Sequence, residues 1–280
     1  MLVNLDAVLK PAREQGYAIG AFNIYSLETA NAVYRAALAC HAPVIFAFGE
    51  RYIDVANISV IASMVRTMAQ DIDIPMVLHL DHCRDITVIY RAVAAGFTSV
   101  MFDGSSLDFD DNLAATRHVV EFAHSVGVTV EAELGSVPFN TADAQVAEEY
   151  LTKPDEASRF VHATGLDALA VAVGTAHGEY KGKPKIYHDR LREIARKVSV
   201  PLVLHGGSGI PDEDVIRAIA SGIAKINVNT QISSVAVKSL KEITHREKPG
   251  ALADIMKEVE DAMTSEVTGF IRLFLQNKTM

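Results

Sequence analysis

The feature that most constrains the fold of this chain is a regular alternation of short apolar segments with segments of helical periodicity. Eight apolar segments have the length and composition of buried strands, and a helical segment follows each of them. Such repeats are typical of parallel sheets, because each helix returns the chain to the start of the next strand. The predicted strands cover residues 17–22, 43–48, 74–80, 99–102, 128–132, 168–173, 201–204 and 224–228. The predicted helices cover residues 27–39, 55–70, 86–95, 112–126, 154–164, 187–197 and 211–220.

Eight strand–helix repeats in 280 residues predict an α/β fold, a single (β/α)8 TIM-barrel domain over residues 1–280. The segment 232–276 has further helical character with a break near residues 249–250, which predicts additional C-terminal helices. A doubly wound sheet is the alternative. It usually carries a Gly-x-Gly-x-x-Gly turn after its first strand, and the sequence has none there.

Three predicted strands are followed by a histidine. These are His82, His177 and His205, and glycine follows the last two directly. Because the carboxyl ends of all strands meet at one mouth of a barrel, we expect the three side chains to converge. Three imidazole ligands with one open position are typical of a catalytic zinc site. Such a metal would act as a Lewis acid on a carbonyl oxygen and stabilise an enediolate.

Other polar side chains stand at the same strand ends. Asp81 adjoins His82 and is therefore a candidate for proton transfer. Asp103 and Glu133 are expected to orient the histidines or to form a second metal site with His82, although Asp103 before Gly104 is equally well read as a turn former. The remaining strand-end residues are Asn23 and Asn227. We interpret His79 as a packed neighbour, and Cys83 as a small residue at a turn rather than as a metal ligand.

Two loops predict a phosphate site. Gly206-Gly207-Ser208-Gly209 follows the seventh predicted strand, and Asn227-Val228-Asn229-Thr230 ends the eighth. In barrels of this kind the loops after strands seven and eight commonly bind phosphate through backbone N–H groups and helix N-termini.

Composition narrows the class of partner and the compartment. The net charge of −9 argues against a nucleic-acid surface, which needs clustered Lys and Arg. Of the two cysteines, Cys40 lies in a helical pattern, so a structural disulfide is not expected and a reducing cytoplasm fits. The sequence has no apolar run of membrane-spanning length and no secretion signal at its start. We therefore expect a cytoplasmic protein that binds neither nucleic acid nor membrane.

Taken together, these motifs resemble the class II, zinc-dependent ketose-bisphosphate aldolases, which include the fructose- and tagatose-bisphosphate enzymes. The resemblance runs from about Leu5 to Ser233. It is carried by Ala21-Phe-Asn-Ile-Tyr-Ser-Leu-Glu28, His79-Leu-Asp-His82, Val130-Glu-Ala-Glu-Leu-Gly135, Ala170-Val-Ala-Val-Gly-Thr-Ala-His-Gly178, Leu204-His-Gly-Gly-Ser-Gly-Ile210 and Lys225-Ile-Asn-Val-Asn-Thr230. It implies a TIM-barrel lyase of carbohydrate metabolism that forms a homodimer or homotetramer.

The resemblance also implies residue roles. Zinc would be bound by His82, His177 and His205, and Asp81 would be the acid/base at the acceptor hydroxyl. The reaction would be reversible aldol cleavage of a phosphorylated ketose to dihydroxyacetone phosphate and an aldehyde, through a zinc-stabilised enediolate. A monovalent cation, Na⁺ or K⁺, often lies near the phosphate in this family. The implied phosphate and substrate residues are Asn23, Gly178, Gly206, Gly207, Ser208, Asn227, Val228, Asn229 and Thr230.

One loop departs from the family pattern. After Glu-Leu-Gly the family usually carries Gly-Gly-x-Glu-Asp, whose glutamate moves a proton at the ketone-side carbon, and this chain lacks that stretch. Asp143, Glu148 and Glu149 are the candidates to replace it, or no residue does. The stretch Phe46-Ala-Phe-Gly-Glu-Arg51 also lies near the place where the family often has a small hydroxyl residue for the distal phosphate. The short C-terminal tail has no clear distal-phosphate arginine, and Arg51 or a partner subunit would have to supply the charge.

From these changes we expect the acceptor aldehyde to differ from glyceraldehyde 3-phosphate. One alternative is a class II aldolase-like lyase that acts on a non-standard or unphosphorylated ketose. Another is a non-catalytic barrel that binds a sugar phosphate, although Asp81 argues for catalysis because a pure binder needs no acid there. A zinc hydrolase shares the three histidines but gives no reason for two phosphate-type loops.

Overall fold

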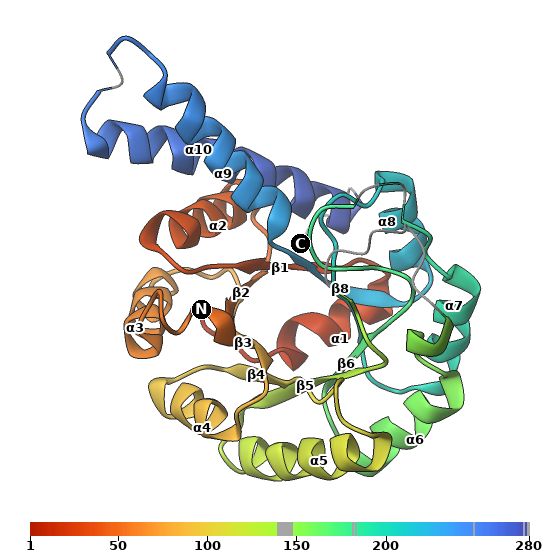
Figure 1. Ribbon diagram of the computed structural model, residues 1–280. Helices are drawn as coiled ribbons and strands as arrows, with labels where there is room; N and C mark the ends of the chain where they lie inside the picture. Colours follow the sequence, from red (N-terminus) through yellow and green to blue (C-terminus); the bar gives the residue numbers. More distant parts are fainter. Residues whose placement is uncertain (139–147, 181, 183, 249, 277, 279–280) are drawn as a thin grey trace.

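The computed structural model describes residues 1–138, 148–180, 182, 184–248, 250–276 and 278 of the chain. Eight parallel strands form a closed barrel in sequence order, and β8 pairs with β1 to complete the ring (Figure 1). The predicted TIM barrel is therefore confirmed. The strands are β1 (Ile19–Asn23), β2 (Val44–Gly49), β3 (Met76–Cys83), β4 (Ser99–Phe102), β5 (Thr129–Leu134), β6 (Ala168–Val171), β7 (Leu202–Leu204) and β8 (Ile223–Val228).

Helices lie outside the ring and cover the strands. Several begin and end where the sequence predicted, because capping residues fix their ends. For example, α4 lies between Asp85, whose carboxylate accepts from the Thr87 N–H at 2.8 Å, and Gly96, which adopts a φ of 100°. The helices that follow β1 to β7 are, in order, α2 (Leu27–Cys40), α3 (Ile58–Met68), α4 (Ile86–Ala95), α5 (Phe109–Ser125), α6 (Pro154–Thr164), α7 (His188–Lys197) and α8 (Asp212–Ala220). Two short 3-10 turns, η1 (Glu50–Tyr52) and η2 (Glu148–Tyr150), lie after β2 and β5.

A helix that the sequence analysis did not predict precedes the first strand. This helix, α1 (Asp6–Gln15), starts after Leu5 without a side-chain cap and contains Pro11, and both features hide its helical signal. Its buried face includes Val8 and Leu9. The N–H of Leu5 donates to Oγ1 of Thr129 at 3.1 Å, and Thr129 begins β5. Therefore α1 covers the amino-terminal end of the barrel and leaves the opposite mouth for the site.

The predicted helix over residues 55–70 is shorter than expected. It begins at Ile58 because Asn57 caps it, with the Ser59 N–H donating to the Asn57 side chain at 2.9 Å. The three residues Glu50–Tyr52 instead form the turn η1, directly after β2. This turn places Glu50 and Tyr52 beside the carboxyl ends of the strands.

The C-terminal region forms two helices, α9 (Thr230–Thr244) and α10 (Leu252–Leu275), which extend beyond the barrel (Figure 1). The predicted break falls between them. The second helix returns to the barrel and packs against α2, where Arg35 donates to Glu260 at 2.7 Å. None of the helices in the described ranges is both long and apolar enough to cross a membrane.

Candidate active site

The barrel interior carries polar residues in pairs two positions apart on the same strand. His79 and Asp81 form such a pair on β3, Glu131 and Glu133 on β5, and Lys225 and Asn227 on β8. Residues i and i+2 of a strand point to the same face, so each pair points into the barrel. The second member of each pair is nearer the carboxyl end, where the predicted site lies. The first member lies one layer deeper.

The three predicted histidines converge at this mouth. Their ligand atoms all lie within 4.8 Å of one another. Nε2 of His82 is 2.7 Å from Nδ1 of His205, and the ring of His177 lies 4.8 Å from the ring of His82, nearly perpendicular to it. The sequence-based prediction that these side chains meet is thus borne out by their geometry.

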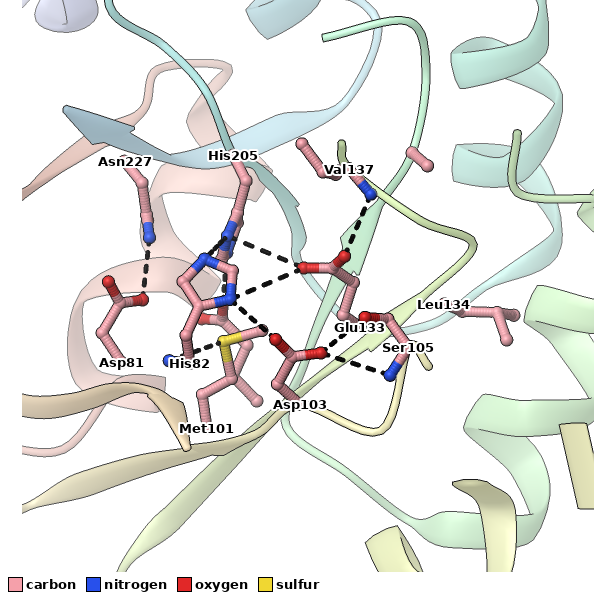
Figure 2. A network of polar contacts seen from close by, with 12 residues as sticks. Asp81, His82, Met101, Asp103, Ser105, Glu133, Leu134, Val137, His205 and Asn227 are labelled. Carbon is pink, nitrogen blue, oxygen red and sulfur yellow. Dashed lines mark hydrogen bonds and ion pairs between the residues drawn. The ribbon is translucent and has the colours of Figure 1, made fainter. Parts of the chain in front are cut away.

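Carboxylates set the orientation of two of these rings. Nδ1 of His82 lies 3.0 Å from Oδ2 of Asp103, and Nε2 of His205 lies 2.9 Å from Oε1 of Glu131 (the first contact is drawn in Figure 2). Each carboxylate accepts a hydrogen bond from one ring nitrogen, which leaves the other nitrogen directed at the centre of the cluster. His82 therefore presents Nε2, and His205 presents Nδ1.

The electrostatic surroundings keep two rings neutral and favour charge on the third. Burial lowers the pKa of His177 to about 3 and also lowers the pKa of His205. Burial opposes charge on His82 as well, but Asp81, Asp103 and Glu133 outweigh it and raise its pKa to about 9. A cation bound here would take over the charge that the protonated His82 ring carries in its absence.

Asp81 lies beside the histidines and is held by two amides. Nδ2 of Asn23 donates to Oδ2 of Asp81 at 3.0 Å, and Nδ2 of Asn227 donates to Oδ1 at 3.0 Å (the second bond is drawn in Figure 2). Burial alone would raise the pKa of Asp81, but the neighbouring positive charge of His82 outweighs it and holds this pKa well below its usual range. The carboxylate is therefore ionised and fixed in place. Asn23 and Asn227, predicted as substrate residues, also position Asp81.

Asp103 and Glu133 lie on the other side of His82, and the three can form a second set of metal ligands. Burial raises the pKa of Glu133 to about 8, and its Oε2 atom has no hydrogen-bond partner among the residues that the structure describes. Both interpretations of Asp103 hold at once, since Oδ1 accepts from the backbone N–H and hydroxyl of Ser105 in a turn while Oδ2 contacts His82. Figure 2 shows both carboxylates directed toward the histidines.

A buried polar layer beneath the histidines was missed by the sequence analysis. Lys225 and Glu131 have fully buried side chains, and Nζ of Lys225 donates to Oε2 of Glu131 at 2.6 Å. His79, correctly predicted as a packed neighbour, lies in the same layer, with Nδ1 2.8 Å from Oγ of Ser99. The sequence does contain a pattern that points to this layer, because Lys225, Glu131 and His79 each stand two positions before a polar residue at a strand end.

The end of β3, which carries His82, has an unusual backbone. His82 adopts a φ of 48°, in the left-handed region, and the β3–β4 register shifts between Leu80 and Cys83. The carboxylate of Glu50 accepts from the N–H groups of Arg84 at 3.0 Å and Asp85 at 3.2 Å, and Cys83 Sγ lies 3.5 Å from it. Glu50 thus fastens the residues that follow His82 to the end of β2. Cys83 is buried, but it is the last residue of β3 and not part of a turn as predicted, because it pairs with Phe102 of β4.

The two predicted phosphate loops lie side by side at the same mouth. Gly206 adopts a φ of 70°, and a Cβ atom there would lie 2.3 Å from the carbonyl oxygen of Ala176. A Cβ at Gly207 would lie 2.6 Å from Ile226, and the Gly207 N–H donates to the Asn227 carbonyl at 2.9 Å. These glycines therefore allow the loops after β6, β7 and β8 to approach closely.

A cavity of about 450 Å³ opens at this mouth. Its lining includes most of the predicted substrate and metal residues: Asn23, Asp81, His82, Asp103, His177, Gly178, Gly206, Ser208, Asn227, Asn229 and Thr230. In the described part of the chain, four predicted site residues are not among the lining residues: Glu133, His205, Gly207 and Val228. Glu50, Arg51, Tyr52 and Arg84 line the cavity as well. The two arginines add positive charge, which the sequence analysis recognised only for Arg51.

Three acidic residues were predicted as replacements for the missing loop glutamate. Asp143 lies outside the described residues. Glu148 and Glu149 belong to η2 and are exposed, and Glu148 lies 3.3 Å from Nη2 of Arg190. Neither glutamate lines the cavity as far as the described residues define it.

The donor set fits a metal ion. Three imidazole nitrogens converge, two of the rings are oriented by carboxylates, and the rings of His177 and His205 are kept neutral, as metal ligands must be. Imidazole ligands suit zinc among the common divalent ions. The cluster therefore has the composition and orientation of a metal centre beside a fixed carboxylate.

Comparisons with known proteins agree with this arrangement. A family model described as fructose-bisphosphate aldolase class-II matches residues 3–279. A fructose-bisphosphate aldolase from Staphylococcus aureus is 41% identical over 252 residues, which cover 88% of this chain and 87% of that protein. A sulfofructosephosphate aldolase from Alkalicoccus urumqiensis is 35% identical over 271 residues, covering 95% and 94%. The crystal structure of the YdjI aldolase from Escherichia coli K12 superposes with a TM-score of 0.89 at 35% identity, covering 98% and 97%.

Proposed function

The chain belongs to the class-II fructose-bisphosphate aldolase family and is an aldolase, a carbon–carbon lyase that cleaves a phosphorylated ketose; within that activity, we propose the following roles for its residues. The observation that carries the proposal is the convergence of three histidine rings within 4.8 Å, beside the fixed carboxylate of Asp81. The products proposed are dihydroxyacetone phosphate and an aldehyde.

His82, His177 and His205 would hold a zinc ion, the metal that class II aldolases generally use. When bound, zinc supplies a Lewis acid that polarises a carbonyl oxygen. Asp103 and Glu131 keep His82 and His205 turned so that Nε2 of the first and Nδ1 of the second face the metal position. Glu133 and Asp103, with His82, offer a second position for a cation.

Asp81 would move the proton on the substrate hydroxyl at the carbon that becomes the aldehyde. In the cleavage direction this hydroxyl must lose its proton as the carbon–carbon bond breaks. Asp81 suits the role of base because it is ionised, and because the amides of Asn23 and Asn227 leave its position little freedom. In the direction of synthesis the same atom returns the proton to the new hydroxyl.

The phosphate next to the ketone would bind between the loops after β6, β7 and β8. Gly178, Gly206, Ser208, Asn229 and Thr230 line this part of the cavity, and Thr230 begins α9. The first turn of a helix directs unpaired N–H groups outward and favours an anion. Gly207 would contribute by letting the loops pack, because its own N–H is bonded to Asn227. A Na⁺ or K⁺ ion near this phosphate is part of the proposal.

The acceptor side of the cavity would determine which aldehyde is used. Gly49 lines it and offers no hydroxyl group, whereas Arg51 and Arg84 lie at the cavity wall. This combination supports an acceptor aldehyde that differs from glyceraldehyde 3-phosphate and carries an anionic group.

The protein would function as a homodimer or homotetramer. The projecting α9–α10 pair exposes the apolar side chains of Val237, Leu240 and Leu252, which a second copy could cover.

An assay of the zinc-loaded protein tests the proposed function. Release of dihydroxyacetone phosphate is followed from a panel of ketose 1-phosphates and ketose 1,6-bisphosphates, with and without a chelator. We expect chelator-sensitive release from at least one of them. Turnover of fructose or tagatose bisphosphate at rates comparable with ordinary members of the family would refute the altered acceptor. No release from any substrate in the panel would refute the proposed products.

A further inference from the structure

Below the three histidines, the barrel interior holds a charged layer, and the proposed function uses only one of its contacts, the one between Glu131 and His205. Lys225, Glu131 and His79 are fully buried there. Nζ of Lys225 donates to Oε2 of Glu131 at 2.6 Å and lies 3.4 Å from Nε2 of His79. Buried charges are costly to desolvate, and apolar residues of similar volume often serve stability equally well. Filling the core therefore does not account for this layer.

The layer connects to the site through one atom. Oε1 of Glu131 lies 2.9 Å from Nε2 of His205, and Nδ1 of the same ring lies 2.7 Å from His82. A lysine ammonium group can only donate hydrogen bonds, and an ionised carboxylate can only accept them. Lys225 therefore occupies Oε2 of Glu131, and Oε1 is left to accept from an N–H on Nε2 of His205.

The tautomer of His205 follows from this contact. A neutral imidazole carries its proton on one nitrogen and a lone pair on the other. With the proton on Nε2, the lone pair lies on Nδ1, which faces His82 and His177. The opposite tautomer would direct an N–H at the place where a metal must bind.

We propose that Lys225 and Glu131 are positioning residues that fix His205 in the tautomer with a proton on Nε2, and thereby hold its Nδ1 lone pair ready for zinc. The inference rests on the proposed metal centre but concerns residues outside it. It assigns Lys225 a role in zinc binding although a layer of side chains separates it from the metal position.

The substitution Glu131→Gln tests this role while keeping the shape of the side chain. Because Lys225 can only donate, it should attract the new amide oxygen, so the amide NH2 group would face Nε2 of His205. That contact favours the wrong tautomer, and we expect zinc affinity to fall about 10–100-fold, as for other partners of metal-binding histidines.

The double substitution Glu131→Gln with Lys225→Met should restore part of this loss. Without the ammonium group, nothing fixes the amide oxygen, and the amide can rotate so that its oxygen accepts from Nε2 of His205. We therefore expect the double variant to bind zinc more tightly than Glu131→Gln alone. A role in packing alone predicts the reverse, because the second substitution would add to the damage.

Two measurements separate the outcomes. Nitrogen-15 NMR of the metal-free protein reads the tautomer of His205 directly, and competition with a chromophoric chelator gives the zinc affinity. Thr164→Val, which removes a buried hydrogen bond to the Phe160 carbonyl on α6, is the control and should change neither. We expect a proton on Nε2 in the wild type, on Nδ1 in Glu131→Gln, and on Nε2 again in the double variant.

The proposal is overturned if His205 keeps its tautomer in Glu131→Gln, or if the double variant binds zinc no better than the single one. Failure of the wild type to bind zinc would refute the metal centre and this role together. Normal zinc binding by the wild type and by Glu131→Gln alike would refute only the positioning role.

Discussion

Nε2 of His82 lies 2.7 Å from Nδ1 of His205, although the residues are 123 positions apart in the chain. Both nitrogens are directed there by carboxylates behind the rings, Asp103 for the first and Glu131 for the second. The contact therefore joins two prospective metal ligands from distant parts of the sequence. The fold itself brings these ligands together.

Because the ligands are already in place, we expect zinc to stabilise the fold. A ligand that binds only the folded state adds about 2.7 kcal/mol when its concentration is 100 times its dissociation constant. Thermal unfolding should therefore move to a higher temperature with zinc and return with a chelator. In His177→Ala the shift should largely disappear, whereas His118→Ala, remote on α5, should retain it. An equal shift in both variants would place the metal elsewhere.

Asp81→Asn should separate chemistry from metal binding. The substitution keeps the shape of the side chain but removes the base, and loss of a general acid–base group lowers rates by about 10²–10⁴-fold. We expect kcat/KM for ketose cleavage to fall by that amount while the zinc affinity changes by less than about tenfold. Asp110→Asn, on the exposed face of α5, is the control. Retention of more than a tenth of the wild-type rate would exclude Asp81 as the proton carrier.

Glu50→Ala should remove the hydrogen bonds that fix the backbone just after His82, at the end of β3. The carboxylate accepts from two consecutive N–H groups, of Arg84 and Asp85, which lie two and three positions after His82, the residue with a φ of 48°. Unusual backbone conformations persist only where surrounding contacts enforce them. We expect weaker zinc binding, by about tenfold or more, and a lower free energy of unfolding. Glu121→Ala removes an exposed carboxylate on α5 and should affect neither quantity.

Tyr180 joins the loops after β6 and β7, which are two of the three loops that would bind the phosphate. Its hydroxyl accepts from the Ala176 N–H at 2.9 Å and donates to the Gly206 carbonyl at 2.9 Å. Tyr180→Phe leaves both groups without this partner, at a cost of about 1–3 kcal/mol for a buried group. We expect KM for the phosphorylated ketose to rise more than kcat falls. Tyr34→Phe on α2 is the control, and a change in kcat alone would contradict this role.

Ionisation of the Tyr180 hydroxyl should make the stability of the fold depend on pH. Burial raises the pKa of Tyr180 to about 12, above the ordinary value of 10. A group whose pKa is raised in the folded state stabilises the fold fully below its unfolded pKa and loses that contribution as pH rises through the folded value. The difference in unfolding free energy between wild type and Tyr180→Phe should therefore narrow between pH 10 and pH 12. Urea unfolding at pH 8 and at pH 10.5 would measure it, and a difference that widens would contradict the assignment.

Much of the fold was predictable because local signals coincide with the ends of its elements. Gly96 and Gly165 end α4 and α6, and Pro154 begins α6, as their conformational preferences require. The helix α1 was missed because Leu5 gives it no cap and Pro11 interrupts its pattern. The strand-end histidines were predictable because parallel topology alone brings strand ends together.

The buried layer of Lys225, Glu131 and His79 could not be predicted from the rule that a polar residue ends an apolar strand, and neither could the contacts of Glu50 near His82. Lys225 and Glu131 lie inside strands, where a charged residue interrupts the apolar pattern instead of ending it. Their partnership spans 94 positions and depends on how the strands are staggered in the closed ring. The role of Glu50 was equally hard to predict, because its hydrogen bonds to Arg84 and Asp85 depend on the short turn η1, for which the sequence has no clear signal.

The acceptor side gives a prediction about specificity. Arg84 lines the cavity, its backbone N–H is fixed by Glu50, and Nη2 of its side chain lies 3.5 Å from Asp103. Arg51 lines the same cavity beside the ring of Tyr52. Hydrogen bonds to charged groups contribute about 1.5–3 kcal/mol, or roughly tenfold to over 100-fold in rate if they form in the transition state. Arg84→Met should therefore lower kcat/KM by that factor for ketose 1-phosphates that end in an anionic group.

The same substitution should leave ketose 1-phosphates with an uncharged end within a few-fold of the wild-type rate, because they have no charge for Arg84 to contact. Comparing phosphate, sulfonate and carboxylate ends in one panel would show which anion depends most on this side chain. Arg117→Met, an exposed substitution on α5, controls for the change in net charge. If Arg84→Met slows charged and uncharged substrates equally, its effect passes through Asp103 to His82. The recognition of an anionic acceptor would then have to come from Arg51 or from a partner subunit.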